Sequence, residues 1–231
     1  METKAPESVP ANERWPVYWL MMLTGGFFGA FTYSVRGGVF CNAQTGNVVL
    51  LAMALGNRNW AKAGYYLVPI TAYCLGAVVS EAAGQRAGKK HRPLRWEAVL
   101  VMIEMAVVVG LGFLPEEAPV QITQVTVNFI ASMQYNTFRK TQGVPVATTF
   151  CTNHIRQVGV SLCHLLTHEG EHAKYENELW VHVGMLAAFV LGGAVSAALC
   201  GVFLGRAVWF AELPLAAALV YLLRAGQRAG G

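Results

Sequence analysis

Long uncharged stretches alternate with short polar segments along this chain. A helix needs about 20 apolar residues to cross about 30 Å of hydrocarbon, whereas a surface helix of a soluble protein keeps a charged or polar face. The pattern therefore predicts an all-α protein, a polytopic membrane helix bundle. The stretches without a charged residue are 17–35, 37–57, 63–80, 118–138 and 183–205, and single carboxylates, Glu104 and Glu212, interrupt the stretches 98–114 and 207–223.

The charges between these stretches predict how the helices are oriented. Segment 85–95 is rich in Lys and Arg, and Arg139 begins a second basic segment. In segment 115–119 (PEEAP), the only charged residues are acidic. Cytoplasmic loops of membrane proteins are enriched in basic residues. We therefore expect both basic segments in the cytoplasm and segment 115–119 outside.

The number of crossings depends on two shorter elements, 39–56 and 144–166. If each is a short broken or re-entrant element, the chain crosses about six times and both termini are cytoplasmic. If both cross fully, there are eight spans, and Arg224 and Arg228 lie outside. The bias of basic residues toward the cytoplasm favours six spans.

Two parts of the chain, 28–55 and 133–162, follow the same order of features. In each, a spanning helix is followed by Arg, Gly and an amide- and Thr-rich run, and two more long apolar stretches come next. Three crossings per half give the halves opposite orientations, which is an inverted repeat of two three-span halves, as in many secondary transporters. The expected organisation is a polar leader at 1–16, a single membrane domain at 17–224 built from the repeats 17–114 and 119–223, and a polar tail at 225–231.

Helix-breaking residues interrupt both halves, Gly37 and Gly38 in the first and Gly143 and Pro145 in the second. Non-helical backbone at membrane depth must be buried in protein or line a polar cavity, and matched interruptions in two halves point to a substrate site. The N-terminus of a half-helix would favour an anionic or carbonyl-bearing ligand. The candidate substrate-binding residues are Asn42, Gln44, Thr45, Gly46 and Asn47 in the first break, and Gln134, Asn136, Thr148, Thr149, Thr152, Asn153 and His154 in the second.

The same residue types have a structural alternative. Asn, Thr and Gly also hold helices together through close packing and interhelical hydrogen bonds, so the breaks could serve packing alone. The small-residue stretches Gly25–Gly29 and Gly192–Gly193 are expected to mark close helix contacts, either within the chain or across a homodimer interface.

Three charged residues are candidates for a proton or charge relay: Glu104, Arg36 and Arg156. A carboxylate near the bilayer centre costs about 2.5–3.5 kcal/mol. Glu104 should therefore face the bundle interior, protonated or paired with Arg36, Arg139 or Arg156, and a purely structural hydrogen bond is the alternative. Arg36 and Arg139 each end a spanning helix, where they either extend to the interface or attract an anion.

Composition narrows the class of partner. Hydrophobic residues make up 55% of the chain and charged residues 13%, whereas about 25% charged is usual. The net charge of +4 comes from basic residues beside apolar stretches, so the expected partners are the lipid bilayer and a small-molecule solute, and no nucleic acid. The five scattered cysteines do not indicate a disulfide framework.

A histidine stripe at His164, His168 and His172 has the spacing of one helix face and would suit a transition metal. However, Gly170 interrupts the helix, and the surrounding residues are polar. We interpret the segment as a solvated loop, and we expect neither a metal site nor a cofactor.

The motifs at the two breaks are similar to those of a known family, and the similarity covers most of the chain from about residue 17. The chain resembles the YoaK family of small bacterial inner-membrane proteins, which implies a multi-span protein of the inner (plasma) membrane and gives no substrate. The first motif is seen in Gly37-Gly38-Val39-Phe40, Asn42 and Thr45-Gly46-Asn47, and the second in Met133-Gln134, Asn136, Pro145, Thr148-Thr149-Phe150 and Thr152.

These observations favour a small secondary transporter or channel for a small polar or anionic solute, with a midplane site formed by the two discontinuous helices. A non-transporting membrane scaffold or assembly protein is the alternative. An intramembrane enzyme using Glu104, His154 or Cys151 is a third, but the sequence contains no GxSxG motif, and its HExxH match, HEGEH at 168–172, lies in the segment interpreted above as a solvated loop. We therefore assign no catalytic residue.

Overall fold

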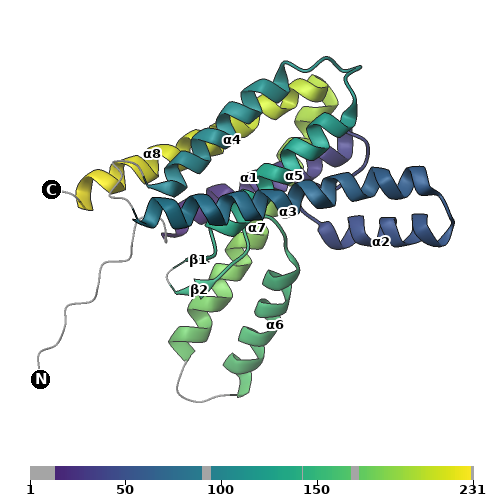
Figure 1. The fold of residues 1–231 in the computed structure, drawn as a ribbon. Helices are drawn as coiled ribbons and strands as arrows, with labels where there is room; N and C mark the ends of the chain where they lie inside the picture. Colours follow the sequence, from purple (N-terminus) through teal and green to yellow (C-terminus); the bar gives the residue numbers. More distant parts are fainter. Residues whose placement is uncertain (1–13, 90–94, 142, 168–171, 230–231) are drawn as a thin grey trace, which may run out of the picture.

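The computed structural model describes residues 14–89, 95–141, 143–167 and 172–229, which form an all-α protein with one very short β-hairpin. Most of the leader, residues 90–94 of the basic segment, residues 168–171 of the histidine segment and the last two residues lie outside the described residues. The elements are α1 (Trp15–Val35), α2 (Gln44–Gly56), α3 (Trp60–Lys89), α4 (Trp96–Gly112), α5 (Val120–Thr137), β1 (Lys140–Thr141), β2 (Val144–Pro145), α6 (Thr152–Thr167), α7 (His172–Phe203), the 3₁₀ helix η2 (Leu204–Ala211) and α8 (Glu212–Ala229) (Figure 1).

Helix α1 lies at the centre of the bundle. It packs most extensively against α7, and α3 packs most extensively against α5. A Cβ at Gly26 of α1 would overlap the carbonyl oxygen of Phe189 in α7, and a Cβ at Gly76 of α3 would overlap that of Phe129 in α5. Glycine lets the two backbones touch at each crossing. The expectation that the glycine stretches mark close helix contacts is thus confirmed within the chain.

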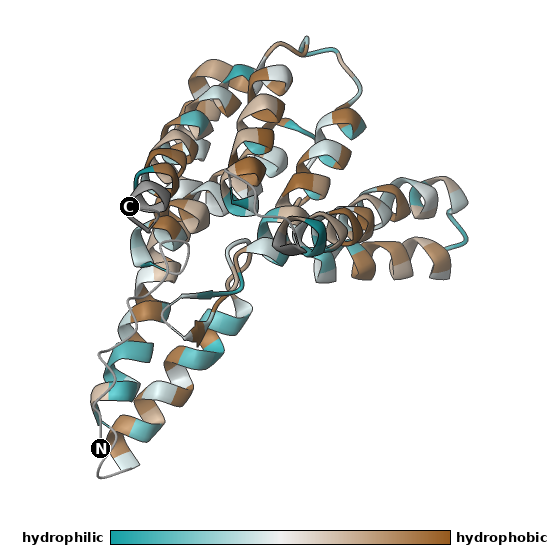
Figure 2. Ribbon diagram, turned by 60° about the vertical axis from the view of Figure 1, so that its left-hand side comes forward, coloured by the Kyte–Doolittle hydropathy of each residue, from teal (hydrophilic) through white to brown (hydrophobic). Residues whose placement is uncertain are grey.

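The outer faces of the long helices remain apolar. Leu75 of α3 is 58% exposed and Val190 of α7 is 67% exposed, and apolar residues follow much of the α2–α3 hairpin (Figure 2). The helical stretches Trp60–Ala87 and His172–Arg224, of which the second comprises α7, η2 and most of α8, are long and apolar enough to cross a membrane. Such faces suit hydrocarbon better than water.

One end of the bundle, which we call end A, is closed by an ion pair. Arg36, just after α1, donates from Nη1 to Oε2 of Glu116 at 3.1 Å. The backbone N–H of Gly205 in η2 donates to the other carboxylate oxygen of Glu116 at 2.8 Å. Near the same end, Gln124 of α5 donates to the Arg36 carbonyl at 2.8 Å and to the hydroxyl of Tyr65 in α3 at 2.7 Å.

A second group of polar contacts, end B, lies at the other end of α1. The backbone N–H of Lys140 donates to the hydroxyl of Tyr18 at 3.2 Å, and Arg139 donates to Glu81 at 2.6 Å. Trp96, the first residue of α4, donates to Thr137, the last residue of α5. Helices α1 and α4 therefore run from end B to end A, and α3 and α5 run from end A to end B.

After each of α1 and α5, the chain doubles back toward the middle of the bundle. Helix α1 ends at Val35, but the Asn42 side chain donates to the carbonyl of Gly25 at 2.9 Å. That carbonyl lies ten residues back, or about 15 Å along the helix. After α5 and the hairpin, Thr148 reaches the same turn of α1 from end B, since a Cβ at Gly25 would overlap its carbonyl oxygen. Helices α2 and α6 begin directly after these two returns.

The last part of the chain differs from the expected span at 207–223. Helix α7 ends at Phe203, where Leu204 takes a positive φ of 51°, and residues 204–211 form the 3₁₀ helix η2. Regular α-helix resumes only at Glu212. The charge of Arg206 separates the apolar stretches 183–205 and 207–223, but hydrophobicity does not indicate whether residues 204–211 form a 3₁₀ helix or an α-helix.

Candidate functional site

Gly25, at the midpoint of α1, is the point where the two breaks meet. Its carbonyl accepts from Asn42 of the first break, and its Cα faces the Thr148 backbone of the second. Gln134 of α5 joins the second break to α1, because its Nε2 donates to the Met21 carbonyl at 3.0 Å and to the Thr148 carbonyl at 3.2 Å. The sequence-predicted residues Asn42, Gln134 and Thr148 are thus brought together around a single turn of α1.

The first break is closed by its own amides. Gly37 and Gly38 turn the chain with φ values of 85° and 68°, which favour glycine. Gln44 then donates to the side-chain oxygen of Asn128 at 2.5 Å and to the Cys41 carbonyl at 3.0 Å. Asn47 donates back into its own loop and to Gln44. The side-chain amides of this break, Asn42, Gln44 and Asn47, are therefore engaged with protein atoms, as in the packing alternative.

Two residues of this network, Gln124 and Asn128 of α5, were not among the predicted site residues. The Asn128 amide donates to the Gln124 carbonyl at 2.7 Å and accepts from Gln44. Their four-residue spacing within the uncharged stretch 118–138 puts both on one helix face, and this spacing was the signal that could have identified them.

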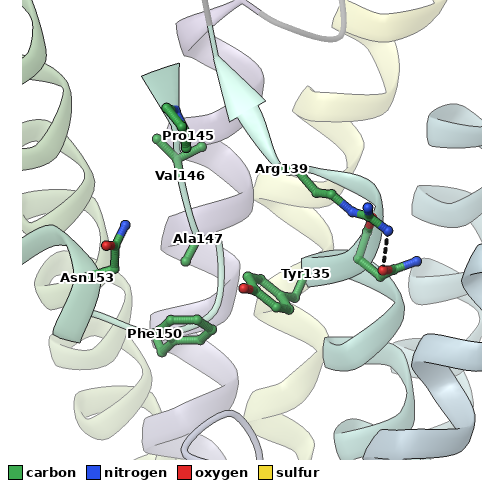
Figure 3. A pocket seen from close by; sticks show the side chains of 8 residues that line it. Tyr135, Arg139, Pro145, Val146, Ala147, Phe150 and Asn153 are labelled. Carbon is green, nitrogen blue, oxygen red and sulfur yellow. Dashed lines mark hydrogen bonds between the residues drawn. The ribbon is translucent and has the colours of Figure 1, made fainter. Parts of the chain in front are cut away.

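The second break borders a cavity of about 500 Å³. Figure 3 shows Tyr135 and Arg139 on one side of the space and Asn153 on the other, with Phe150 between them. Of the predicted site residues, Asn136 and Asn153 line it. The full lining consists of Tyr135, Asn136, Arg139, Pro145, Val146, Ala147, Phe150 and Asn153, four polar and four apolar residues.

Arg139 is fixed at the edge of this cavity by three acceptors. Its Nε donates to the Asn136 carbonyl at 2.5 Å, and its Nη2 donates to Oε2 of Glu81 and to the Asn136 side-chain oxygen. The Asn136 amide also donates to Glu81 at 3.2 Å. The Arg139 side chain is 57% exposed, so the guanidinium keeps a face toward water while its orientation is set.

The start of α6 forms the opposite wall. Asn153 lies in the first turn, where backbone N–H groups have no partner within the helix. Such a terminus carries roughly half a positive charge. A guanidinium, two side-chain amides and a helix N-terminus around one space can hold an anion or a carbonyl group, and Tyr135 and Phe150 offer apolar ring faces to the rest of a solute.

The remaining predicted residues are distributed differently. Thr45 and Gly46 are exposed in the first turn of α2, and Thr152 is exposed at the start of α6. The hydroxyls of Thr148 and Thr149 are buried, and neither has a hydrogen-bond partner in the described part of the chain. His154 is fully buried and contacts His182 of α7, a residue that the sequence analysis did not single out.

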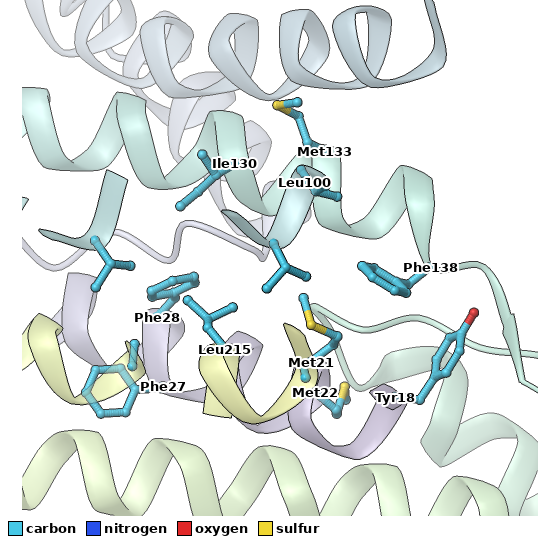
Figure 4. Close-up of a cluster of buried hydrophobic side chains, with 14 of the residues drawn as sticks. Tyr18, Met21, Met22, Phe27, Phe28, Leu100, Ile130, Met133, Phe138 and Leu215 are labelled. Carbon is cyan, nitrogen blue, oxygen red and sulfur yellow. The ribbon is translucent and has the colours of Figure 1, made fainter. Parts of the chain in front are cut away.

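Glu104 was expected to be either protonated or paired with an arginine, and no such pair is present among the described residues. Glu104 faces the interior as predicted, one turn from Leu100 of the buried apolar cluster (Figure 4), but neither carboxylate oxygen has a partner among the described residues. Arg36 pairs with Glu116 and Arg139 with Glu81. The Arg36 side chain is only 3% exposed, so it is buried in the bundle where it pairs with Glu116. The third candidate, Arg156, is exposed on α6.

The histidine stripe is described only in part. The ring of His164 stacks on that of Tyr175, with centroids 4.3 Å apart, and His168 lies outside the described residues. Among the residues that the structure describes, no group of three or more His, Cys, Asp or Glu side chains is placed to hold a metal ion.

Comparison with known proteins adds a family but no function. Residues 17–221 match the model of a family described as "Protein of unknown function (DUF1275)". No curated protein is significantly similar to the chain. No solved structure is significantly similar to it.

Proposed function

The chain belongs to the DUF1275 family, and we propose that it is a small secondary transporter or channel for a small polar or anionic solute. The observation that carries this proposal is that two broken segments reach Gly25, the midpoint of α1, from opposite ends of the bundle. Interrupted helices that meet at the midplane are the usual setting of a substrate site in secondary transporters. The YoaK-type motifs lie in these same two segments.

The arrangement of ends A and B supports six spans. Positions 36, 116 and 205 meet at end A, and positions 18, 81, 96 and 139 meet at end B. With α2 and α6 as re-entrant elements, six helices alternate between the two ends. End B carries the basic segments and would face the cytoplasm of a bacterial inner membrane, together with both termini.

Helix pairing supports an inverted repeat. Helix α1 packs on α7 as α5 packs on α3, and α2 packs on α3 as α6 packs on α7. If each helix of one half is replaced by its counterpart in the other half, the main helix–helix contacts are therefore the same. The third helix of each half also carries a matching sequence, LGAVVS at 75–80 and LGGAVS at 191–196, whose first glycine lies at the close crossing in both cases.

Within this scheme, the solute would bind in the cavity at the second break. Arg139 and the first turn of α6 would hold an anionic or carbonyl group, with Asn136 and Asn153 as further hydrogen-bond partners. A charge-assisted hydrogen bond contributes about 1.5–3 kcal/mol, which corresponds to about a tenfold to a hundredfold change in affinity.

The test is a thermal-shift screen of the purified full-length protein against small carboxylates, phosphate, amino acids and nucleobases. A ligand at about 100 times its Kd stabilises by about 2.7 kcal/mol. Arg139→Gln and Asn153→Ala should weaken the binding of any ligand that the screen finds. Arg206→Gln, the same charge change at an exposed position of η2, should leave this binding unchanged. Equal binding by all three variants would exclude this cavity.

A membrane scaffold is the second candidate, and the first break favours it. There Asn42, Gln44 and Asn47 are all hydrogen bonded within the protein. A protein that binds no solute in the screen and moves none in proteoliposomes would support the scaffold.

A further inference from the structure

Two histidines from different helices make a direct contact beside the second break. His154, in the first turn of α6, and His182 of α7 are 0% and 1% exposed. Their Nδ1 atoms lie 2.8 Å apart, which is a hydrogen-bond distance. The other nitrogen of His154, Nε2, lies 2.7 Å from the Ala147 carbonyl oxygen.

This geometry determines where the protons are. A carbonyl oxygen only accepts, so Nε2 of His154 must carry a proton. When His154 is neutral, its Nδ1 is then an acceptor, and Nδ1 of His182 must donate to it. Nε2 of His182 consequently carries a free lone pair, and the described residues provide no hydrogen-bond partner for it.

We infer that the His154–His182 pair is a proton-binding site that takes up one further proton at Nε2 of His182. The proton comes from water, and no other bond is made or broken. The added charge strengthens the contact that is already present, because the His182 Nδ1–H then donates as part of an imidazolium to the neutral His154. One added proton is therefore compatible with the observed geometry, whereas a second would place two N–H groups against each other.

The pair adjoins the proposed solute cavity. Ala147, whose carbonyl holds His154, lines this cavity, and so does Asn153, the residue before His154. A positive charge on the pair would attract an anion in the cavity, and by linkage a bound anion would favour the proton to the same extent. This step rests on the proposed function and names the proton as the coupled ion.

The other charged groups around the pair come from few elements. Arg156 of α6 is close enough to act electrostatically on His182 and opposes a further positive charge. On α7, Glu178 lies one helical turn before His182 and is partly buried. Helix α1, which packs against α7, has no charged residue, and the returning segment 146–151 contributes only the Cys151 thiol.

The first experiment tests the site itself, by nuclear magnetic resonance of the full-length protein in lipid with isotope-labelled histidine. A scalar coupling between the two Nδ1 atoms is expected across the N–H···N bond. As the pH is lowered from about 8 to about 3, the Nε2 signal of His182 should move from the unprotonated to the protonated position while the coupling persists. An Nε2 signal that stays constant over this range would overturn the inference.

Variants separate proton binding from structure. In His182→Asn the side-chain amide can still donate to His154 Nδ1 but takes up no proton, so this variant should fold and lose the titration of the pair. His164→Asn, which removes a histidine stacked on Tyr175 outside the pair, should leave that titration unchanged. Loss of the titration in both variants would show that it does not belong to this pair.

The second experiment tests the coupling, with acetate and phosphate as probe anions in thermal-shift titrations at about pH 8 and about pH 5. Binding at least tenfold tighter at the lower pH, lost in His182→Asn, is expected. Equally tight binding at both values would overturn the coupling and leave the proposed function standing. A pair that titrates while neither anion binds at either pH would contradict both the coupling and the anion site, and the proton site would stand.

Discussion

At the scale of single residues, Gly25 matters most because no larger residue fits where α1 meets both breaks. Its Cα faces the carbonyl oxygen of Thr148, and its own carbonyl holds Asn42. The next helical turn repeats the situation, since a Cβ at Gly29 would lie 3.1 Å from the Asn42 amide. The glycines of α1 are thus required by close approach, although they weaken an isolated helix.

Gly25→Ala should destabilise the protein, because the new methyl group would press on backbone that cannot rotate away. Overpacking of this kind costs about 1–3 kcal/mol, measured by thermal unfolding of the purified protein. Gly110→Ala is the matched control, since no atom lies within 4 Å of a Cβ there, and it should be neutral or stabilise by up to about 1 kcal/mol. Equal stability of the two variants would mean that the crossing at Gly25 is loose.

What could be predicted at this scale was local. Gly37, Gly38 and Gly143 were expected to break helices, and all three have positive φ. The unpaired state of Glu104 and the partner of His154 could not be predicted, because both depend on which helices cross. The residues next to His154 in the sequence do not indicate which helix it contacts, because its partner on α7 lies 28 positions away.

At the scale of elements, α2 and α6 are anchored in different ways. The start of α2 is held by several amides from its own loop and from α5. The segment before α6 is held to α1 through Gln134, and α6 is held to α7 by the histidine pair. The second break is therefore held by fewer side-chain hydrogen bonds and borders the open cavity. In the proposed transport cycle, we expect it to move more than the first break.

Gln134→Leu should loosen the second break alone. It removes the hydrogen bonds to the Met21 and Thr148 carbonyls, worth about 1–3 kcal/mol together with the groups left unsatisfied. Amide hydrogen exchange should accelerate about tenfold to a hundredfold in residues 146–155 and remain unchanged in 36–47. Gln44→Leu should give the reverse pattern, and acceleration of both segments in either variant would show that the two breaks open as one unit.

The apolar stretches predicted which helices exist better than where the helices end. The stretches 98–114 and 118–138 match α4 and α5 within two residues, because glycine, proline and charge bound them. Helix α7 begins eleven residues before the stretch 183–205, since its polar first turns are still helical where they pack against α6. The 3₁₀ helix at 204–211 had no sequence signal.

At the scale of the whole molecule, each half completes the other. The first helix of each half finds its main partner in the third helix of the opposite half. Neither half buries its own glycine-lined face, so the fold needs both. The repeat was proposed from the two breaks, whereas the exchange of partners between halves is a tertiary property that a sequence pattern does not contain.

The six-span proposal predicts which positions share a side of the membrane. In a cysteine-free background, single cysteines at Glu117 and Arg206, both exposed near end A, should react with a membrane-impermeant maleimide added to intact cells. A cysteine at Arg86, beyond end B, should react only after the cells are opened. Labelling of Arg206 and Arg86 from the same side would exclude six alternating spans.

The close crossing of α1 with α7 also bears on how the protein is made. Helix α1 leaves the ribosome before its main partner, α7, which is completed only at Phe203. At about 5–20 residues per second, the interval is on the order of 10–30 s. During biosynthesis the glycine-lined face of α1 therefore stays uncovered for this interval. A chaperone or an insertase helix that binds α1 temporarily would contact this face.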